Sequence, residues 1–193
     1  MTSLRLRLRL FTSIILLMVL LESCSSEDPQ IGQLLGNSIV EIGSTTPNNW
    51  FFSTAQGKYN VTWTDKESFS PNKSLQISIQ SPESTDFAFW GQTINTNLPT
   101  GNSVTLKVKI KGNLTGTGIS IAIRGDDTVQ AAGTGEQFVT TQGTSPISGT
   151  FDWTDYSIKL DNVDPGTQSL TVYLVFLPNT TGEVYFDDII LTN

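Results

Sequence analysis

The stretch Val104-Thr-Leu-Lys-Val-Lys-Ile-Lys111 alternates one apolar residue with one polar residue along its whole length. This period of two places the apolar side chains on one face of a β-strand and the polar side chains on the other. The same alternation recurs further along the chain, in Ile119–Arg124 and in Leu170–Phe176. Each segment is therefore predicted to be a strand with one buried face.

Strand-like segments account for most of the remaining chain. They are Ile39–Ile42, Tyr59–Thr64, Ser74–Ile79, Phe87–Ile94, Phe138–Thr141, Asp152–Leu160 and Glu183–Thr192. Turn-forming residues separate them, as in Pro47-Asn48-Asn49 and Asp164-Pro165-Gly166. No segment has helical spacing. About ten short antiparallel strands at this spacing predict an all-β fold of the β-sandwich type.

Composition excludes several classes of function. The chain carries a net charge of −7, a single cysteine and no histidine. Without histidine it cannot use Ser-His-Asp or Cys-His catalysis, or a histidine-based zinc site. An acidic protein repels nucleic acid and anionic lipid, so neither is an expected partner.

The N-terminus has the pattern of a secretory signal. Arg5, Arg7 and Arg9 precede the apolar run Leu10–Leu21, which is too short to span a bilayer. The residues Leu21-Glu-Ser-Cys24 resemble the lipobox of bacterial lipoproteins. This resemblance implies that residues 1–23 are removed and that Cys24 carries palmitate-type acyl chains, which anchor the chain stably when two or three are present. The alternative is an ordinary cleaved signal with an incidental cysteine.

Residues 24–36 are polar and glycine-containing, as expected of a tether. Within them, Ser25-Ser-Glu-Asp28 resembles the signal that exports lipoproteins to the outer face of the outer membrane in Bacteroidetes-type bacteria. The expected location is therefore the cell surface, although a merely solvated linker would have the same composition. Loss of the signal removes three positive charges and one negative charge, which changes the net charge from −7 to −9.

Residues 37–193 form the expected single domain, and the order of their landmarks is informative. The landmarks are Ser38-Ile-Val-Glu41, Thr46-Pro-Asn-Asn-Trp50, Pro71-Asn-Lys-Ser-Leu-Gln-Ile77, Phe89-Trp-Gly-Gln92, Gly149-Thr-Phe-Asp-Trp-Thr-Asp-Tyr156 and Gly182-Glu-Val-Tyr-Phe-Asp-Asp-Ile189. Their order and spacing resemble carbohydrate-binding modules of the family 4, 9 and 22 type. That resemblance implies a galactose-binding-like jelly roll that binds a polysaccharide.

The adjacent carboxylates Asp187 and Asp188 lie in the last predicted strand. By alternation Asp187 shares a face with Tyr185, Ile189 and Leu191, so its carboxylate is expected in an apolar layer, where it needs a partner or a cation. In the resembling family an early Glu and a late Asp hold a structural calcium ion, and these positions correspond to Glu41 and Asp187. The metal-site hypothesis therefore names Glu41, Asp187 and Asp188. The alternatives are that Asp187 bonds a serine or backbone amides, and that Asp188 is a solvated edge residue.

Sugar recognition requires an aromatic plane beside hydrogen-bonding groups. In Phe87–Gln92 we interpret the row containing Phe87 and Phe89 as core, which places Trp90 and Gln92 on the ligand face. The alternative for Trp90 is a core position under a loop.

Three further side chains complete the predicted glycan site. Arg124 lies on the outward row of its strand and can fork onto neighbouring hydroxyls, or else pair with Asp126 or Asp127. Trp63 and Glu136 are additional candidates.

The predicted function is non-catalytic glycan binding at the cell surface, which would supply neighbouring glycan-utilisation proteins. The first alternative is a structural scaffold with no sugar site. The second is a glycoside hydrolase with Glu136 as its acid, although the sequence indicates no partner carboxylate for Glu136.

Overall fold

The computed structural model describes residues 32–54, 58–81, 85–127, 137–145 and 147–193. All of them belong to the unit Ile31–Asn193. The predicted signal peptide, Cys24, most of the tether and Glu136 lie outside the described residues. Within the described ranges, no helix is long and apolar enough to cross a membrane.

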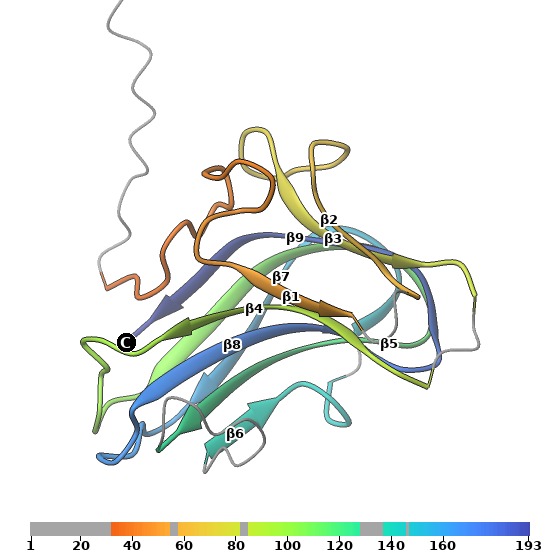
Figure 1. Cartoon of the computed structure of the whole chain (residues 1–193). Helices are drawn as coiled ribbons and strands as arrows, with labels where there is room; N and C mark the ends of the chain where they lie inside the picture. The colour runs from red at the N-terminus through yellow and green to blue at the C-terminus, as the bar shows by residue number, and fades with distance from the viewer. Residues whose placement is uncertain (1–31, 55–57, 82–84, 128–136, 146) are drawn as a thin grey trace, which may run out of the picture. The chain divides into compact units, whose positions relative to one another are not determined.

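The described residues form nine antiparallel strands and no helix (Figure 1). The strands are β1 (Phe51–Thr54), β2 (Asn60–Thr64), β3 (Ser74–Ile79), β4 (Ala88–Ile94), β5 (Val104–Asp126), β6 (Gln137–Thr140), β7 (Ile147–Leu160), β8 (Ser169–Phe176) and β9 (Thr180–Thr192). The predicted all-β jelly roll is confirmed.

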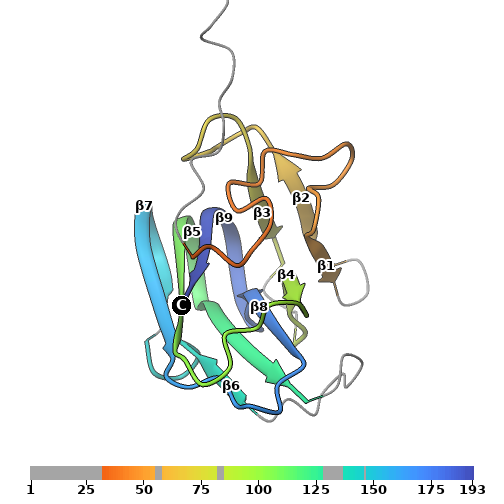
Figure 2. The same ribbon diagram turned by 90° about the vertical axis from the view of Figure 1, so that its left-hand side faces the viewer.

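The long strand β5 joins two sheets into one sandwich (Figure 1, Figure 2). Its first half, up to Gly116, pairs with β9 and β7. Its second half, from Ile119, pairs with β8 and β6 and keeps one pair with β7, Ile119 with Ile147. We call the layer β1-β4-β8-β5-β6 the β8 sheet and the layer β2-β3-β9-β5-β7 the β9 sheet. Gly116 and Gly118 adopt positive φ angles of 102° and 89° between the two halves, a conformation that suits glycine.

The core lies between the two sheets, where the apolar rows of the strands meet. From the β8 sheet come Trp90, Ile121, Ile123, Val172, Leu174 and Phe176, and from the β9 sheet come Leu75, Ile77, Leu106, Ile110, Val184 and Phe186. These side chains are almost fully buried. The apolar residues that alternate in Val104–Lys111 therefore face the core, as predicted.

Three details differ from the sequence prediction. The segments 104–111 and 119–124, predicted as separate strands, are parts of the continuous strand β5. The predicted strand Ile39–Ile42 is a loop, because Val40 has a positive φ of 52° and the Asn37 side chain binds both the N–H and the C=O of Ile42. Strand β1 was not predicted.

The folded domain also begins earlier than residue 37. Leu34 donates its N–H to the carbonyl of Leu191, and Leu35 is buried. The Gln33 amide bonds backbone groups of Ile189 and Leu191. The predicted tether therefore extends four residues too far, because Gln33 and Leu34 form hydrogen bonds with the end of β9 and Leu35 is buried.

Candidate functional site

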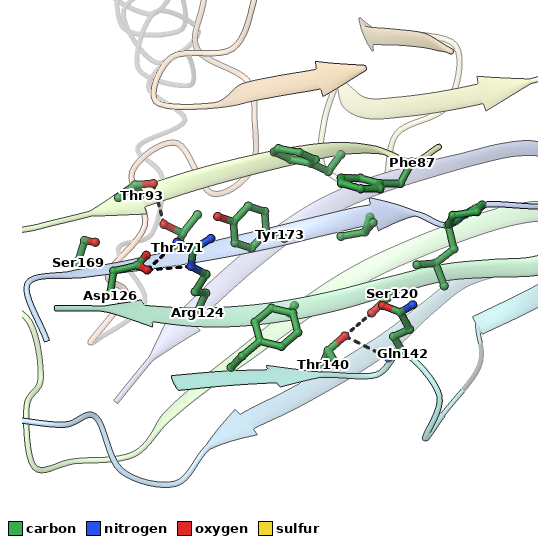
Figure 3. Close-up of a pocket in the computed structure, with 16 residues that line it drawn as sticks. Phe87, Thr93, Ser120, Arg124, Asp126, Thr140, Gln142, Ser169, Thr171 and Tyr173 are labelled. Atoms are coloured by element: carbon green, nitrogen blue, oxygen red, sulfur yellow. Dashed lines mark hydrogen bonds and ion pairs between the residues drawn. The ribbon is translucent and has the colours of Figure 1, made fainter. Parts of the chain in front are cut away.

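The outer face of the β8 sheet carries a cavity of about 660 Å³, which we call the outer pocket (Figure 3). It crosses β4, β8, β5 and β6. Its lining residues are Phe87, Phe89, Thr93, Ser120, Ala122, Arg124, Asp126, Phe138, Thr140, Gln142, Ser169, Thr171, Tyr173, Val175, Leu177 and Pro178.

The strand register explains why these side chains gather. Residues paired across neighbouring strands project from the same face of a sheet. One row consists of Thr93, Thr171, Arg124 and Phe138, and the next consists of Gly91, Tyr173, Ala122 and Thr140. Because Ala122 has a short side chain, the sheet is hollow between the larger neighbours Tyr173 and Arg124.

Aromatic side chains form one wall of the outer pocket. The ring of Phe89 stacks on Phe87 with centroids 6.2 Å apart and meets Tyr173 edge-on at 5.3 Å. On the other side of Phe89, the ring of Phe51 from β1 lies at 6.1 Å. Phe87 and Phe138 are 52% and 58% exposed, so both offer open ring surface to a ligand.

Polar groups occupy the floor and the far side. Arg124 donates from Nε and Nη2 to Oδ1 of Asp126, at 2.8 and 2.7 Å. The hydroxyls of Thr93 and Thr171 lie 2.9 Å apart, and those of Ser120 and Thr140 lie 2.7 Å apart (Figure 3). The site thus combines aromatic planes with hydroxyl and guanidinium groups.

The predicted position of Trp90 on the ligand face is wrong. Trp90 is 1% exposed, and its indole N–H donates to the backbone carbonyl of Gln76 in the opposite sheet. Phe87 and Phe89, interpreted as core, are the residues that line the pocket. The prediction separated the row of Phe87 and Phe89 from the row of Trp90 correctly, but exchanged the buried and the exposed face. Each row contains an aromatic residue, and alternation alone does not say which row is buried.

Gln92 is also inside the fold. Its side chain accepts from the N–H of Gly36 at 2.7 Å and donates to the carbonyl of Gly36 at 2.9 Å. It therefore holds the N-terminal segment and is 2% exposed. It is not available to a ligand.

Of the other predicted glycan contacts, Arg124 lines the outer pocket and Trp63 does not. The predicted alternative for Arg124, an ion pair with Asp126, is present in the same place. Trp63 lies on β2 of the other sheet, where its indole N–H binds the carbonyl of Val40 and Lys73 lies over its ring. Glu136 is outside the described residues.

Sequence reasoning missed the aromatic wall. Tyr173 and Thr171 form the non-apolar row of β8, opposite Leu170, Val172 and Leu174. Because the apolar row of β8 is buried, the row with Thr171 and Tyr173 must face outward. The aromatic ring of Tyr173 on this outer face could have indicated a ligand-binding surface.

Asp187 lies on the outer face of the β9 sheet. It pairs with Lys109, and a β-bulge follows at Asp188, which has a positive φ of 43°. The extra residue reverses the alternation, so Ile189 and Leu191 face the core and Asp187 does not share their side. The expected position of Asp187 in the apolar layer is therefore wrong.

The carboxylate of Asp187 is fully buried beneath the loop 69–73. Oδ2 accepts from the N–H groups of Phe69 and Ser70, and Oδ1 accepts from the Ser70 hydroxyl and the N–H of Asp188, all within 2.9 Å. Burial raises the pKa of Asp187 to about 6, against the lowering effect of these hydrogen bonds. Burial also raises the pKa of Asp188. This is the alternative named for Asp187: bonds to a serine and to backbone amides.

Glu41 holds the same loop from its other end. Its Oε1 accepts from the N–H groups of Asn72 and Lys73, and its Oε2 accepts from the Asn72 amide. A calcium ion requires carboxylate oxygens that point toward it with free lone pairs. Because donors occupy the oxygens of Glu41 and Asp187, these residues do not fit the predicted calcium site, and the described residues contain no cluster of three acidic side chains that fits a metal.

Comparison with known proteins identifies the fold and not a family. No family model matches the chain, and no curated protein matches it. The enzymatically active domain of tailspike protein 4 of bacteriophage CBA120 has a TM-score of 0.64 and 18% identity over 83% of this chain, which spans only 21% of that one.

Two other solved structures match over nearly their whole length. TmCBM61, solved with β-1,4-galactotriose, has a TM-score of 0.53 and 14% identity over 83% of this chain and 98% of its own. The Stig cyclase Fisc from Fischerella sp. TAU has a TM-score of 0.61 and 17% identity over 83% and 96%. Carbohydrate-binding modules of families 4 and 22 share the fold as well. The chain therefore has the jelly roll of carbohydrate-binding modules, which also occurs in a cyclase.

Proposed function

We propose that this protein binds a glycan in the outer pocket without cleaving it. We further propose that it does so at the surface of a bacterial cell, anchored in the outer membrane through lipid on Cys24. The observation that carries the proposal is the aromatic wall of Phe87, Phe89 and Tyr173, facing polar groups across an open cavity. The presence of carbohydrate-binding modules among proteins of the same fold supports it.

The chemistry of the pocket suits a sugar chain. The faces of sugar rings carry apolar C–H groups that pack on aromatic planes, and their edges carry hydroxyls that need hydrogen-bond partners. Phe87 and Phe138 offer the planes on opposite sides of the pocket. Thr171, Ser120 and Gln142 offer the partners between them.

Catalysis is less well supported than binding. A glycoside hydrolase uses two carboxylates on either side of the scissile bond. Among the described lining residues, Asp126 is the one carboxylate, and it is paired with Arg124.

Binding would retain a polysaccharide near neighbouring surface proteins that process or import it.

Affinity electrophoresis tests the proposal. The full chain, purified in detergent, is run through gels containing xylan, β-1,4-galactan or β-glucan. We expect at least one polysaccharide to retard the protein. Phe87→Ala and Phe138→Ala should weaken that interaction at least about tenfold, because burying a phenyl group contributes roughly 1.5–3 kcal/mol.

Phe52→Ala is the matched control. Phe52 is 46% exposed, but its ring packs against Trp90 on the opposite side of the same sheet. Its loss should leave retardation unchanged. Equal loss in all three variants, or no retardation by any glycan of a protein shown to be folded, would favour a scaffold role instead.

A small aromatic molecule is the second candidate ligand. The cyclase with this fold was solved with an indole-containing ligand, and Val175, Leu177 and Pro178 make one end of the outer pocket apolar. Quenching of the Tyr173 and Trp fluorescence by indole derivatives, lost in Phe89→Ala, would favour this candidate over a glycan.

A further inference from the structure

The outer face of the β9 sheet carries a tryptophan whose indole N–H group is not used by the fold. The other three tryptophans, Trp50, Trp63 and Trp90, donate their indole N–H groups to backbone carbonyls. The indole N–H of Trp153 on β7 has no acceptor in the part of the chain that the structure describes. Because no unpaired polar side-chain atom is buried among those residues, this N–H group is accessible at the surface.

A phenylalanine lies beside this tryptophan. The ring of Phe69 meets the ring of Trp153 edge-on, with centroids 6.1 Å apart, and Phe69 is 48% exposed. The ammonium group of Lys109 lies 4.5 Å from the centre of the Phe69 ring and pairs with Asp155 at 2.8 Å. We call Phe69 and Trp153 the aromatic pair. Together they present apolar ring surface and a hydrogen-bond donor at one place.

Buried hydrogen bonds fix the position of Phe69. Its backbone N–H and that of Ser70 donate to Oδ2 of Asp187, at 2.8 and 2.9 Å, and Asp187 is fully buried. The other end of the same loop is held by Glu41. An aromatic side chain on a fixed backbone loses little conformational freedom when a ligand packs on it, which lowers the entropic cost of binding.

A hollow of about 380 Å³ lies next to the aromatic pair. Its lining includes Lys111, whose Nζ lies 3.0 Å from Oε2 of Glu67 and 3.4 Å from Oδ1 of Asp152. Glu67 precedes the phenylalanine of the aromatic pair by two residues, and Asp152 directly precedes its tryptophan, so these ion pairs connect the hollow to the aromatic pair. The other polar lining residues are Asn113, Thr150, Glu183 and Tyr185.

Side-chain hydrogen bonds hold the carboxylate of Glu183 in place. The Tyr185 hydroxyl donates to Oε2 of Glu183 at 2.9 Å, and the Gln76 amide donates to both groups at 3.1 Å. The carbonyl oxygen of that amide accepts in turn from the Thr62 hydroxyl. Because Gln76 and Tyr185 are only 2% and 5% exposed, Glu183 is a preorganised acceptor at the hollow.

We propose that the aromatic pair and the hollow form a second glycan-binding site, on the opposite outer face of the sandwich from the outer pocket. One sugar ring packs on the aromatic pair, with a hydroxyl that accepts a hydrogen bond from the indole N–H of Trp153. The hydroxyls of the next sugar bond Glu183 and Asn113 in the hollow.

The charge of the hollow limits what else could occupy it. Its described lining has three carboxylates, those of Glu67, Asp152 and Glu183, and one lysine, which disfavours a phosphate-rich or otherwise anionic ligand. The second site goes beyond the function proposed for the outer pocket and is independent of it. With both sites occupied, one protein molecule links two glycan segments.

The test follows the indole N–H signals by 15N NMR, in the full chain labelled at tryptophan and purified in detergent. The probes are xylohexaose, cellohexaose and β-1,4-galactotriose. The chain has four tryptophans, and Trp153→Phe identifies the signal of Trp153 by its loss. With at least one probe we expect this signal to shift as the probe is added, whereas the signals of the three carbonyl-bonded tryptophans stay nearly unchanged.

Phe69→Ala should weaken this binding at least about tenfold, because it removes one ring of the aromatic pair. Phe69→Leu, which keeps apolar bulk and loses the ring plane, should act in the same direction and replaces Phe69→Ala if that variant does not fold. Phe52→Ala is the matched control: it removes a phenyl ring of similar exposure, 46% against 48%, from the edge of the β8 sheet and should leave the titration unchanged. Phe87→Ala/Phe138→Ala, altered in the outer pocket, should leave it unchanged as well.

Two results overturn the second site. One is a Trp153 signal that shifts with none of the probes in a folded protein. The other is a shift that disappears in Phe87→Ala/Phe138→Ala, since the change would then be transmitted from the outer pocket. The function proposed for the outer pocket fails separately: gel retardation that survives in Phe87→Ala/Phe138→Ala and is lost in Phe69→Ala would assign binding to the aromatic pair alone.

Discussion

At the residue scale, the carboxylates of Asp126 and Asp187 show how burial changes the role of similar side chains. Asp126 is nearly buried beside a cation, whereas Asp187 is fully buried among N–H and O–H donors. Both carboxylates therefore organise the structure around them. Asp126 pairs with Arg124 in the lining of the outer pocket, and Asp187 fastens the loop 69–73 to β9.

We expect Asp187 to make stability depend on pH. Its folded pKa of about 6 lies above its ordinary value of 3.8, so the folded state holds the proton more tightly than the unfolded state. This contribution to stability is fully present below about pH 4 and is lost as the pH rises to about 6. Measured against Asp187→Asn, which cannot titrate, wild type should lose up to about 3 kcal/mol over this window, at 1.36 kcal/mol per pKa unit.

Urea unfolding of both proteins at pH 4 to 7 checks this expectation. The comparison cancels other titrating groups, including Asp188, to first order. A difference between wild type and Asp187→Asn that stays constant with pH would contradict it. Calcium or a chelator should leave both curves unchanged, because the Asp187 oxygens already accept four hydrogen bonds.

At the scale of elements, β5 determines the architecture by serving both sheets. Its two halves are separated at Gly116, where the backbone approaches the turn before β9. A Cβ atom placed on Gly116 would lie 2.0 Å from the carbonyl oxygen of Asn179. No side chain fits there without moving one of the two segments.

Gly116→Ala should therefore be strongly destabilising. Gly149→Ala is the matched control, because Gly149 has a similar φ of 98° against 102° but open space around its Cβ position. We expect Gly116→Ala to lower the free energy of unfolding by about 1–3 kcal/mol more than Gly149→Ala, as overpacking usually does. Thermal melts of the two variants give the comparison, and equal losses would mean that only the positive φ matters.

At the scale of the whole molecule, the proposed setting depends on the N-terminal segment. Lipid on Cys24 would place the outer pocket near the cell surface, where a retained polysaccharide is useful to neighbouring proteins. The folded unit begins close behind this segment, since Leu34 already bonds β9. A short polar tether would then separate the anchor from the domain.

Labelling with a palmitate analogue in a bacterium that displays surface lipoproteins tests this setting. Wild type should incorporate the label and partition into detergent, and Cys24→Ser should do neither, whereas Ser26→Ala should behave as wild type. Glu27→Gln/Asp28→Asn should keep the label but lose sensitivity to protease added outside the cells. Labelling of Cys24→Ser would contradict lipidation at this residue.

The sequence by itself determined the all-β sandwich, because alternation in segments such as Val104–Lys111 reports directly that one face is buried. It also excluded histidine-dependent chemistry and identified Arg124 as an outward residue. Tertiary structure alone decided which row of Phe87–Gln92 is buried, since both rows are aromatic and period two is symmetric between the faces of a sheet. It likewise decided the side of Asp187, because a bulge at Asp188 reverses the alternation and depends on pairing with β5, a strand distant in sequence.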